Sequence, residues 1–173
     1  MKNGLIHIYC GDGKGKTTAA VGLAVRCVGG GGKVLFCQFL KDGESCENFC
    51  LKNLENVSVS PCPENIKFTF RMNEEEKRAA AEYYTELFEN VCKNAADYDL
   101  LILDEVLDAV NVGFLSEKTL EHFIENKPET LEVVLTGRDP NEYLCEKADY
   151  ITEMKKLKHP YDRGIQARRL VDK

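Results

Sequence analysis

Residues near the amino terminus combine glycine, lysine and threonine in a spacing suited to binding phosphate. The stretch GDGKGKTT at 11–18 follows an apolar run at 5–9 and precedes a mostly apolar segment at 19–25. A strand, a glycine loop and a helix in this order are typical of a P-loop. Glycine permits backbone angles that bring N–H groups close to phosphate, and the start of the helix adds its dipole. We therefore expect Lys16 to supply a charge to the phosphates and Thr17 to supply a hydroxyl ligand for Mg²⁺.

One position of this loop departs from the strict pattern G-x-x-x-x-G-K-[ST]. The pattern requires glycine at position 10, where this chain has Cys10. The flanking apolar segments nevertheless supply the context that the motif needs, and a solvated loop does not explain a Lys-Thr pair at the start of an apolar helix. The predicted nucleotide-binding residues of the loop are Gly11, Asp12, Gly13, Lys14, Gly15, Lys16, Thr17 and Thr18.

Two acidic residues follow a second apolar run. Residues 100–103 are Leu-Leu-Ile-Leu, and Asp104 and Glu105 come directly after them. P-loop proteins place an acid at the end of such a strand, beside the Mg²⁺ of their nucleotide. We predict Thr17, Asp104 and Glu105 as metal ligands. Gln38 interrupts another apolar run, where it either faces a ligand crevice or bonds to neighbouring backbone.

Strand and helix patterns alternate along the chain. Strands are expected at 5–9, 33–40, 57–59, 100–103, 131–135 and 150–154, and helices after 16 and 73, at 116–126 and at 140–147. The stretch 41–56 is predicted to be irregular. Apolar strands alternating with helices predict an α/β fold, with a mostly parallel sheet covered by helices on both faces. We expect one P-loop NTPase-like (RecA-like) domain over residues 1–173, with the glycine loop, the two acids and Arg138 at one edge of the sheet.

Composition excludes several classes of protein. The net charge of −6 argues against a nucleic-acid surface. No apolar run approaches the roughly 20 residues of a membrane span, and no signal peptide precedes the first strand, so we expect a cytoplasmic protein. The region 155–169 is locally basic, with six Lys and Arg residues against one Asp. It suits either a polyanion such as triphosphate or a solvated surface.

The eight cysteines do not predict disulfides. No C-x-x-C pair occurs, and cytosolic thiols stay reduced. Cys10, Cys27, Cys37 and Cys92 fall within apolar patterns and are expected in the core. Metal binding by the cysteines of the region 46–62 is disfavoured because their spacing lacks the paired knuckles of zinc ribbons.

Apart from its termini, the chain resembles the P-loop ATP:corrinoid adenosyltransferases. The segments that carry the resemblance are GDGKGKTTAA at 11–20, AVRCVGGG around Arg26, VLFCQFLK at 34–41, LILDE at 101–105, VVLTGRDP at 133–140 and ADYITEMKKLKHPYDRGIQARR at 148–169. The LTGR and TEMKKLKHP segments are more specific than a general P-loop. In that family the first loop position is usually Thr, so Cys10 is a departure there too.

The resemblance implies transfer of the 5′-deoxyadenosyl group of ATP to the Co(I) of a reduced corrinoid, cobalamin or a precursor, with release of triphosphate. Co(I) is itself a strong nucleophile, so the protein has to position the 5′-carbon of ATP, exclude water and neutralise the negative charge that grows on the triphosphate leaving group. Lys16 is a candidate catalytic residue for that last task. The resemblance also implies that Thr17 and Glu105 hold Mg²⁺ (or Mn²⁺) and that Arg26 and Arg138 lie near the nucleotide.

A short aromatic segment matches the place where the family has F-T-W. Here it is Phe68-Thr69-Phe70, and the chain has no Trp. The resemblance implies that Phe68 and Phe70, as candidate catalytic residues, form an apolar wall beneath the corrin and displace its lower axial ligand. Alternatively, both rings simply anchor a long loop to the core.

The resemblance also implies partners. We expect a homodimer and a flavoprotein that reduces the corrinoid. The alternative from another class is a P-loop ATPase that acts as a regulatory switch with a protein partner, releasing ADP and phosphate instead of triphosphate. A GTPase is disfavoured, because Asn-Lys-Pro-Glu at 126–129 follows a helix and precedes a strand, which is the wrong context for a guanine-reading loop.

Overall fold

The computed structural model describes residues 3–63 and 69–172, and at residue 70 the backbone alone. Among these residues, six strands form a single parallel sheet in the order β3-β2-β4-β5-β1-β6. The strands are β1 (Ile6–Cys10), β2 (Val34–Gln38), β3 (Val57–Val59), β4 (Leu100–Asp104), β5 (Glu132–Thr136) and β6 (Tyr150–Glu153). Each lies within about two residues of its predicted position, so the prediction of a parallel α/β fold is confirmed.

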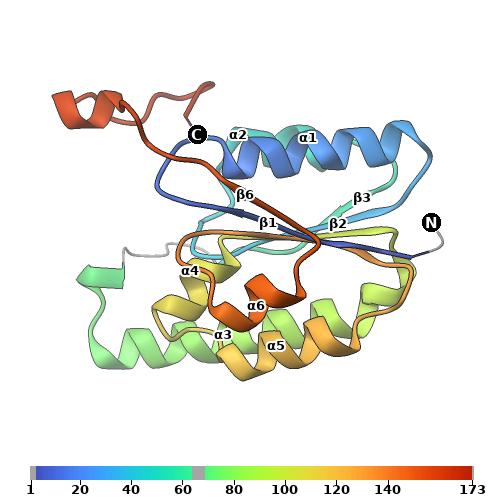
Figure 1. Ribbon diagram of the computed structural model, residues 1–173. Helices are drawn as coiled ribbons and strands as arrows, with labels where there is room; N and C mark the ends of the chain where they lie inside the picture. Colours follow the sequence, from blue (N-terminus) through green and yellow to red (C-terminus); the bar gives the residue numbers. More distant parts are fainter. Residues whose placement is uncertain (1–2, 64–68, 173) are drawn as a thin grey trace.

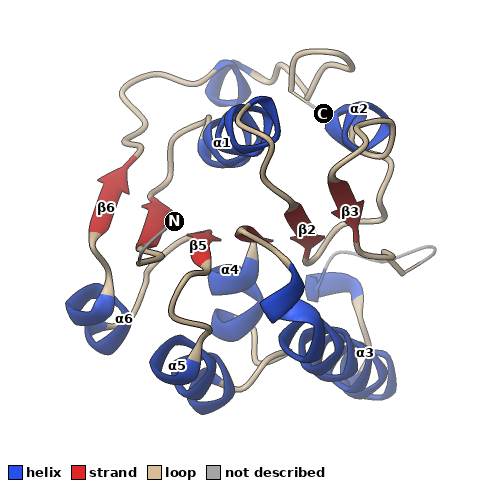
Figure 2. Cartoon of the chain, turned by 90° about the vertical axis from the view of Figure 1, so that its right-hand side faces the viewer, coloured by secondary structure: helices blue, strands red, loops and turns tan. Residues whose placement is uncertain are grey.

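Helices cover both faces of this sheet (Figures 1 and 2). One face carries α1 (Lys16–Gly29) and α2 (Cys46–Leu51), and the other carries α3 (Glu74–Asn94), α4 (Val106–Asn111), α5 (Glu117–Asn126) and α6 (Glu142–Lys147). Three short 3₁₀ turns complete the described elements, η1 (Thr69–Arg71), η2 (Ala95–Asp97) and η3 (Pro160–Arg163). Within the described part of the chain, no helix is both long and apolar enough to cross a membrane.

The core has two halves because neighbouring side chains of a strand point to opposite faces. Phe36 and Ile102 are fully buried under α1 and pack in the same cluster as Ala20 and Ala24. Cys37, Leu103 and Leu135 point the other way and join the cluster that includes the aromatic side chains of α3. Continuous apolar strands such as β2 and β4 are therefore buried on both sides, as the sequence predicts.

The long helix α3 begins where its predicted cap stands. The Asn73 side chain accepts a hydrogen bond from the Glu76 N–H at 2.9 Å, and the Glu76 carboxylate accepts one from the Asn73 N–H, also at 2.9 Å. This is a capping box. Tyr84, Leu87, Phe88 and the rest of the predicted stripe then face the sheet, so the prediction of a core helix is confirmed.

Two short helices were not predicted. The stretch 41–56, expected to be irregular, contains α2, so that prediction is wrong in part. Helix α4 begins immediately after Glu105, where no helix was expected. Both have six residues, too few to display an apolar stripe over two turns, and neither has the side-chain cap that Asn141 gives the equally short α6.

The topology brings three strand ends together. β5 lies between β1 and β4, with Tyr9 opposite Thr136 and Leu103 opposite Leu135. Because all the strands are parallel, the loop after β1, Glu105 after β4 and Thr136 at the end of β5 share the carboxyl edge of the sheet, which is where open α/β folds bind ligands. The extent of the single domain, residues 1–173, stays a prediction.

Candidate active site

The glycine loop, residues 11–16, turns the chain from β1 into α1. Gly11 and Gly15 have φ angles of 101° and 118°, values that favour glycine. Helix α1 begins at Lys16 with Gly15 as its cap, and no side chain caps it. The free N–H groups of its first turn are therefore available to an anion.

The Lys16 ammonium lies inside this loop. Its Nζ donates to the carbonyl oxygens of Gly11 at 2.6 Å and Gly13 at 3.0 Å. Burial lowers the pKa of Lys16, and the nearby Arg138 charge lowers it further, whereas Asp108, Glu105 and others oppose the change. The loop thus holds a cation at its centre, bound by neutral carbonyls that an anion can replace.

The segment after β6 crosses the outer side of the glycine loop. The Met154 N–H donates to the Cys10 carbonyl at 2.8 Å, and the Gly13 N–H donates back to the Met154 carbonyl at 2.6 Å. A Cβ added at Gly13 would come within 2.5 Å of that same carbonyl oxygen. Gly13 is therefore needed for close packing against residue 154.

Further along, the chain returns to the same loop. Lys156 N–H donates to Asp12 Oδ1 at 2.8 Å, and this bond lowers the pKa of Asp12. Lys14 Nζ donates to the Val171 carbonyl at 2.8 Å and lies 3.5 Å from the Asp172 carboxylate. Figure 1 shows the carboxyl terminus beside the start of α1. The start of the basic region 155–169, at Lys156, and residues 171–172 therefore contact the glycine loop.

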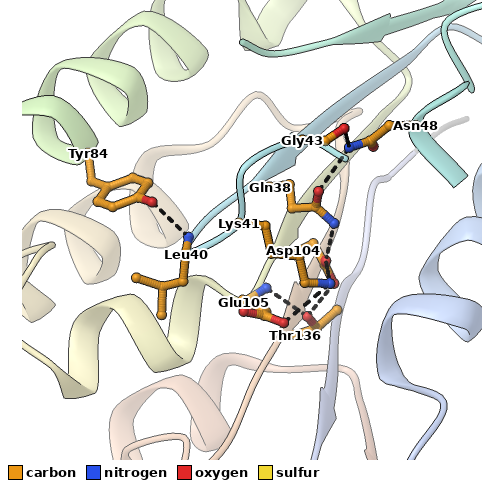
Figure 3. Close-up of polar contacts among 9 residues, drawn as sticks. All are labelled: Gln38, Leu40, Lys41, Gly43, Asn48, Tyr84, Asp104, Glu105 and Thr136. Carbon is orange, nitrogen blue, oxygen red and sulfur yellow. Dashed lines mark hydrogen bonds and ion pairs between the residues drawn. The ribbon is translucent and has the colours of Figure 1, made fainter. Parts of the chain in front are cut away.

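At the end of β4, Asp104 is fully buried, and each oxygen of its carboxylate has a hydrogen-bond partner. The Thr136 hydroxyl donates to Asp104 Oδ1 at 2.8 Å and accepts a hydrogen bond from the Glu105 N–H at 2.9 Å. Glu105 has a φ angle of 59°, in the left-handed region, and caps α4. Thr136 thus holds the carboxylate of Asp104 and the backbone of Glu105, and Figure 3 shows the three residues together.

The second oxygen of Asp104 belongs to another set of contacts. Gln38 Nε2 donates to Asp104 Oδ2 at 3.0 Å, and Gln38 Oε1 accepts from Asn48 Nδ2 at 3.0 Å. The carboxylate only accepts hydrogen bonds, so it fixes the orientation of the Gln38 amide. Gln38 is buried, and its side-chain hydrogen bonds join it to Asp104 and Asn48 instead of to neighbouring backbone; a place at the ligand crevice stays a prediction.

Lys41 completes this cluster. Its Nζ lies 3.5 Å from Asp104 Oδ2 and 3.3 Å from Glu105 Oε1 (Figure 3). Burial alone would lower the pKa of Lys41, but the charges of Asp104 and Glu105 outweigh it and the pKa is raised. Burial raises the pKa of Glu105 to about 7, with Asp104 adding to the rise and Lys41 opposing it.

This donor set fits a divalent cation. The two carboxylates converge on one ammonium group, so a single position beside them is already favourable for positive charge. Oxygen ligands are those that Mg²⁺ prefers, and Mg²⁺ normally keeps water and phosphate oxygens as further ligands. Both oxygens of Asp104 already have hydrogen-bond partners, whereas the Glu105 side chain is 30% exposed. Glu105 is therefore the better placed ligand, with Asp104 holding the cluster in shape.

With this geometry in view, comparison with known proteins identifies the family. Residues 2–172 match the family model described as ATP:corrinoid adenosyltransferase BtuR/CobO/CobP. The chain belongs to the ATP:corrinoid adenosyltransferase family.

Individual relatives agree with the family model. The Escherichia coli K12 corrinoid adenosyltransferase is 32% identical over 173 residues, covering 99% of this chain and 86% of that protein. The Pseudomonas aeruginosa corrinoid adenosyltransferase is 32% identical over 174 residues, with 99% and 84% covered. The Salmonella typhimurium corrinoid adenosyltransferase CobA is 30% identical, with 99% and 86% covered. None of these comparisons supports the regulatory-switch alternative.

The predicted adenosyltransferase residues fall into two groups. The glycine loop, Asp104, Glu105 and Arg138 meet at the carboxyl edge, where the charge of Arg138 acts on Lys16, Asp12 and Asp108. Beside them is a cavity of about 660 Å³, lined by the glycine loop, the loop after β5 and the segment 153–162. Thr17 and Thr18 lie in the first turn of α1.

The other group consists of Arg26, Phe68 and Phe70. Arg26 is exposed in the last turn of α1, about 15 Å along the helix from Lys16 given a rise of 1.5 Å per residue. Its nucleotide role stays a prediction. Phe68 lies outside the described residues, and Phe70 is placed in η1 by its backbone only. Their roles also stay predictions.

Sequence reasoning missed two residues of this adenosyltransferase site. Lys41 was not proposed as a site residue, although it follows a buried strand whose last residue is polar. Asp108 was missed as well; its carboxyl lies within electrostatic range of Lys16 and Arg138, and burial raises its pKa. A search for charged residues within one turn of each strand end would have found both.

The structure places all eight cysteines. All eight are free thiols, and the described residues contain no group of three or more His, Cys, Asp or Glu side chains placed to hold a metal ion. Of the four expected in the core, Cys10 and Cys37 are buried, while Cys27 and Cys92 are half-buried. Burial raises the pKa of Cys37 to about 12, so this thiol is unreactive at neutral pH.

Proposed function

We propose that this protein transfers the 5′-deoxyadenosyl group of ATP to the Co(I) of a reduced corrinoid, cobalamin or a precursor, in adenosylcobalamin synthesis or salvage. The electron pair of Co(I) forms the bond to C5′, the bond from C5′ to O5′ breaks, and triphosphate leaves with that bond's electrons. Family membership over almost the whole chain supports this reaction. The observation that carries the assignment to a site is Lys16 held inside the glycine loop at the same sheet edge as Asp104 and Glu105.

The residues have distinct tasks in this proposal. The glycine loop N–H groups and Lys16 bind the triphosphate and stabilise the negative charge that develops on it. Thr17 and Glu105 hold Mg²⁺ or Mn²⁺, which neutralises further phosphate charge when bound. Thr136 and Asp104 keep Glu105 in place. Arg138 adds a second positive charge at the same edge.

The corrinoid and its partners belong to the same proposal. Phe68 and Phe70 form an apolar wall where the lower ligand of the corrinoid would lie, which eases reduction of the cobalt to Co(I). The protein works in the cytoplasm as a homodimer, with a flavoprotein as the reductant.

An anaerobic assay with ATP, Mg²⁺ and chemically reduced corrinoid tests this function. We expect one triphosphate for each cobalt–carbon bond formed, measured by chromatography and by the corrinoid absorption spectrum. Lys16→Ala should lower the rate by orders of magnitude with an unchanged circular dichroism spectrum. The variant lacks the positive charge that stabilises the negative charge on the triphosphate leaving group. Release of ADP and phosphate, or near-normal transfer by folded Lys16→Ala protein, would contradict the proposal.

A further inference from the structure

Lys41 is the one basic side chain, among the described residues, with recorded ion pairs to Asp104 and Glu105. Its side chain is 25% exposed, and Asp104 is not exposed at all. An ion pair so shielded from water is stronger than a surface pair, and either partner left alone would be costly. The cluster therefore depends on a cation being present beside the two carboxylates.

The backbone around Lys41 is held in an unusual shape. Leu40 has a φ angle of 55°, a left-handed conformation that is unfavourable for a residue with a side chain. The Leu40 N–H donates to the Tyr84 hydroxyl at 3.0 Å, and the preceding Phe39 N–H donates to the Asp104 carbonyl at 2.8 Å. Tyr84 is fully buried on α3. These contacts turn the chain so that Lys41 points at the acids (Figure 3).

A divalent cation and this ammonium compete for the same oxygens. Lys41 Nζ is 3.3 Å from Oε1 of Glu105, the side chain better placed to bind a metal. Two cations at that oxygen would repel each other strongly in a partly buried site. The four-carbon stem of lysine is flexible, so the ammonium can move away while the Asp104 carboxylate stays fixed by Thr136 and Gln38 and the Glu105 backbone stays bonded to Thr136.

We propose that Lys41 is a positioning residue that serves as the internal counter-ion of Asp104 and Glu105, and that Mg²⁺ must displace it to bind. Lys41 thereby pairs with both acids before the metal arrives, and its charge weakens the site for free metal. The inference rests on the proposed function, which assigns the metal to these acids. It describes the state of the protein before ATP binds.

The test is a Mn²⁺ titration of protein free of ATP and corrinoid, followed by the electron paramagnetic resonance signal of unbound Mn²⁺. Lys41→Met keeps the length of the side chain and removes its charge. It should bind Mn²⁺ about tenfold more tightly than the unchanged protein, because a repulsive charge next to the ligand is gone. Lys41→Arg keeps the charge and can pair with both carboxylates, so its affinity should equal that of the unchanged protein or fall below it.

Lys77→Met is the matched control, since it removes the same charge from an exposed pair with Glu74 on α3. It should leave Mn²⁺ binding unchanged. If Lys41→Met does not fold, Lys41→Gln takes its place as the neutral variant. Equal or weaker Mn²⁺ binding by the neutral variant, or tighter binding by Lys41→Arg, would overturn the proposal. Because no ATP or corrinoid is present, either result leaves the adenosyl-transfer assay as an independent test of function.

Discussion

The free energy of unfolding offers a direct test of the environment assigned to Glu105. Burial raises the pKa of this carboxyl from 4.5 to about 7 in the folded protein. Between these two pH values the folded state holds a proton that the unfolded state has released, so stability falls as pH rises through this window. Ionised Glu105 therefore destabilises the metal-free protein above pH 7. Glu105→Gln removes the charge and keeps the shape, so it should be more stable there.

The size of the effect follows from the same change. Each pKa unit corresponds to about 1.4 kcal/mol, so a rise of two and a half units sets an upper limit of about 3 kcal/mol at pH 8. The side chain is 30% exposed, and screening by water reduces this to about 2 kcal/mol. At pH 5 the folded wild-type carboxyl is protonated, and the advantage of Glu105→Gln should shrink to under about 1 kcal/mol.

Urea unfolding of metal-free protein at pH 8 and pH 5 measures this difference. Comparing variant with wild type at each pH cancels the titrating groups that do not interact with Glu105. Glu55→Gln, an exposed residue in a turn before β3, controls for the same change in net charge and should show no pH-dependent gap. In the adenosylation assay, Glu105→Gln should need more Mg²⁺ for half-maximal rate, because it loses a carboxylate ligand. The assigned environment would be refuted if Glu105→Gln were no more stable than wild type at pH 8. It would also be refuted if the difference in their free energies of unfolding were the same at pH 8 and pH 5.

Three further outcomes are expected. Phe68→Ala or Phe70→Ala should greatly lower the rate of adenosylation that starts from Co(II) corrinoid and a mild reductant, and should spare activity with pre-formed Co(I). Equal loss in both assays with a lower melting temperature would indicate that the rings only anchor a loop to the core. Asn73→Ala should lower the free energy of unfolding by about 1 kcal/mol because the capping box with Glu76 is lost; an unchanged urea midpoint would contradict this. Tyr84→Phe should lower the free energy of unfolding by about 1–2 kcal/mol, since the Leu40 N–H loses its hydrogen-bond partner. A urea midpoint equal to that of the wild type at the same pH would contradict this.

Much of the fold could be predicted because its signals are local. The apolar runs of β2, β4 and β5 stand out as buried strands, and Asn73 followed by acidic residues marks the start of α3. The edge shared by the glycine loop and the acid pair then follows from parallel topology alone. The six-residue helices α2 and α4 escaped prediction because they are stabilised by tertiary packing and not by periodicity.

The parts of the site that could not be predicted depend on unusual backbone conformations. Lys41 reaches Asp104 only because Leu40 adopts a left-handed conformation, for which a leucine gives no sequence signal. The same is true of Glu105, whose positive φ angle lets its N–H meet the Thr136 hydroxyl. Arg26 shows the opposite difficulty. A family motif singled it out, while the geometry of a straight helix puts it far from Lys16.

The packing of Met154 against Gly13 has a consequence for how the molecule is made during translation. The partner of Gly13 in this contact, residue 154, is synthesised about 140 residues after the glycine loop. Contacts so distant in sequence form late and slow the search for the native state. An emerging chain therefore carries its glycine loop unfinished until β6 has joined β1 at the edge of the sheet. Ribosome-bound chains that stop before residue 150 should accordingly not yet retain ATP, however complete the rest of the sheet.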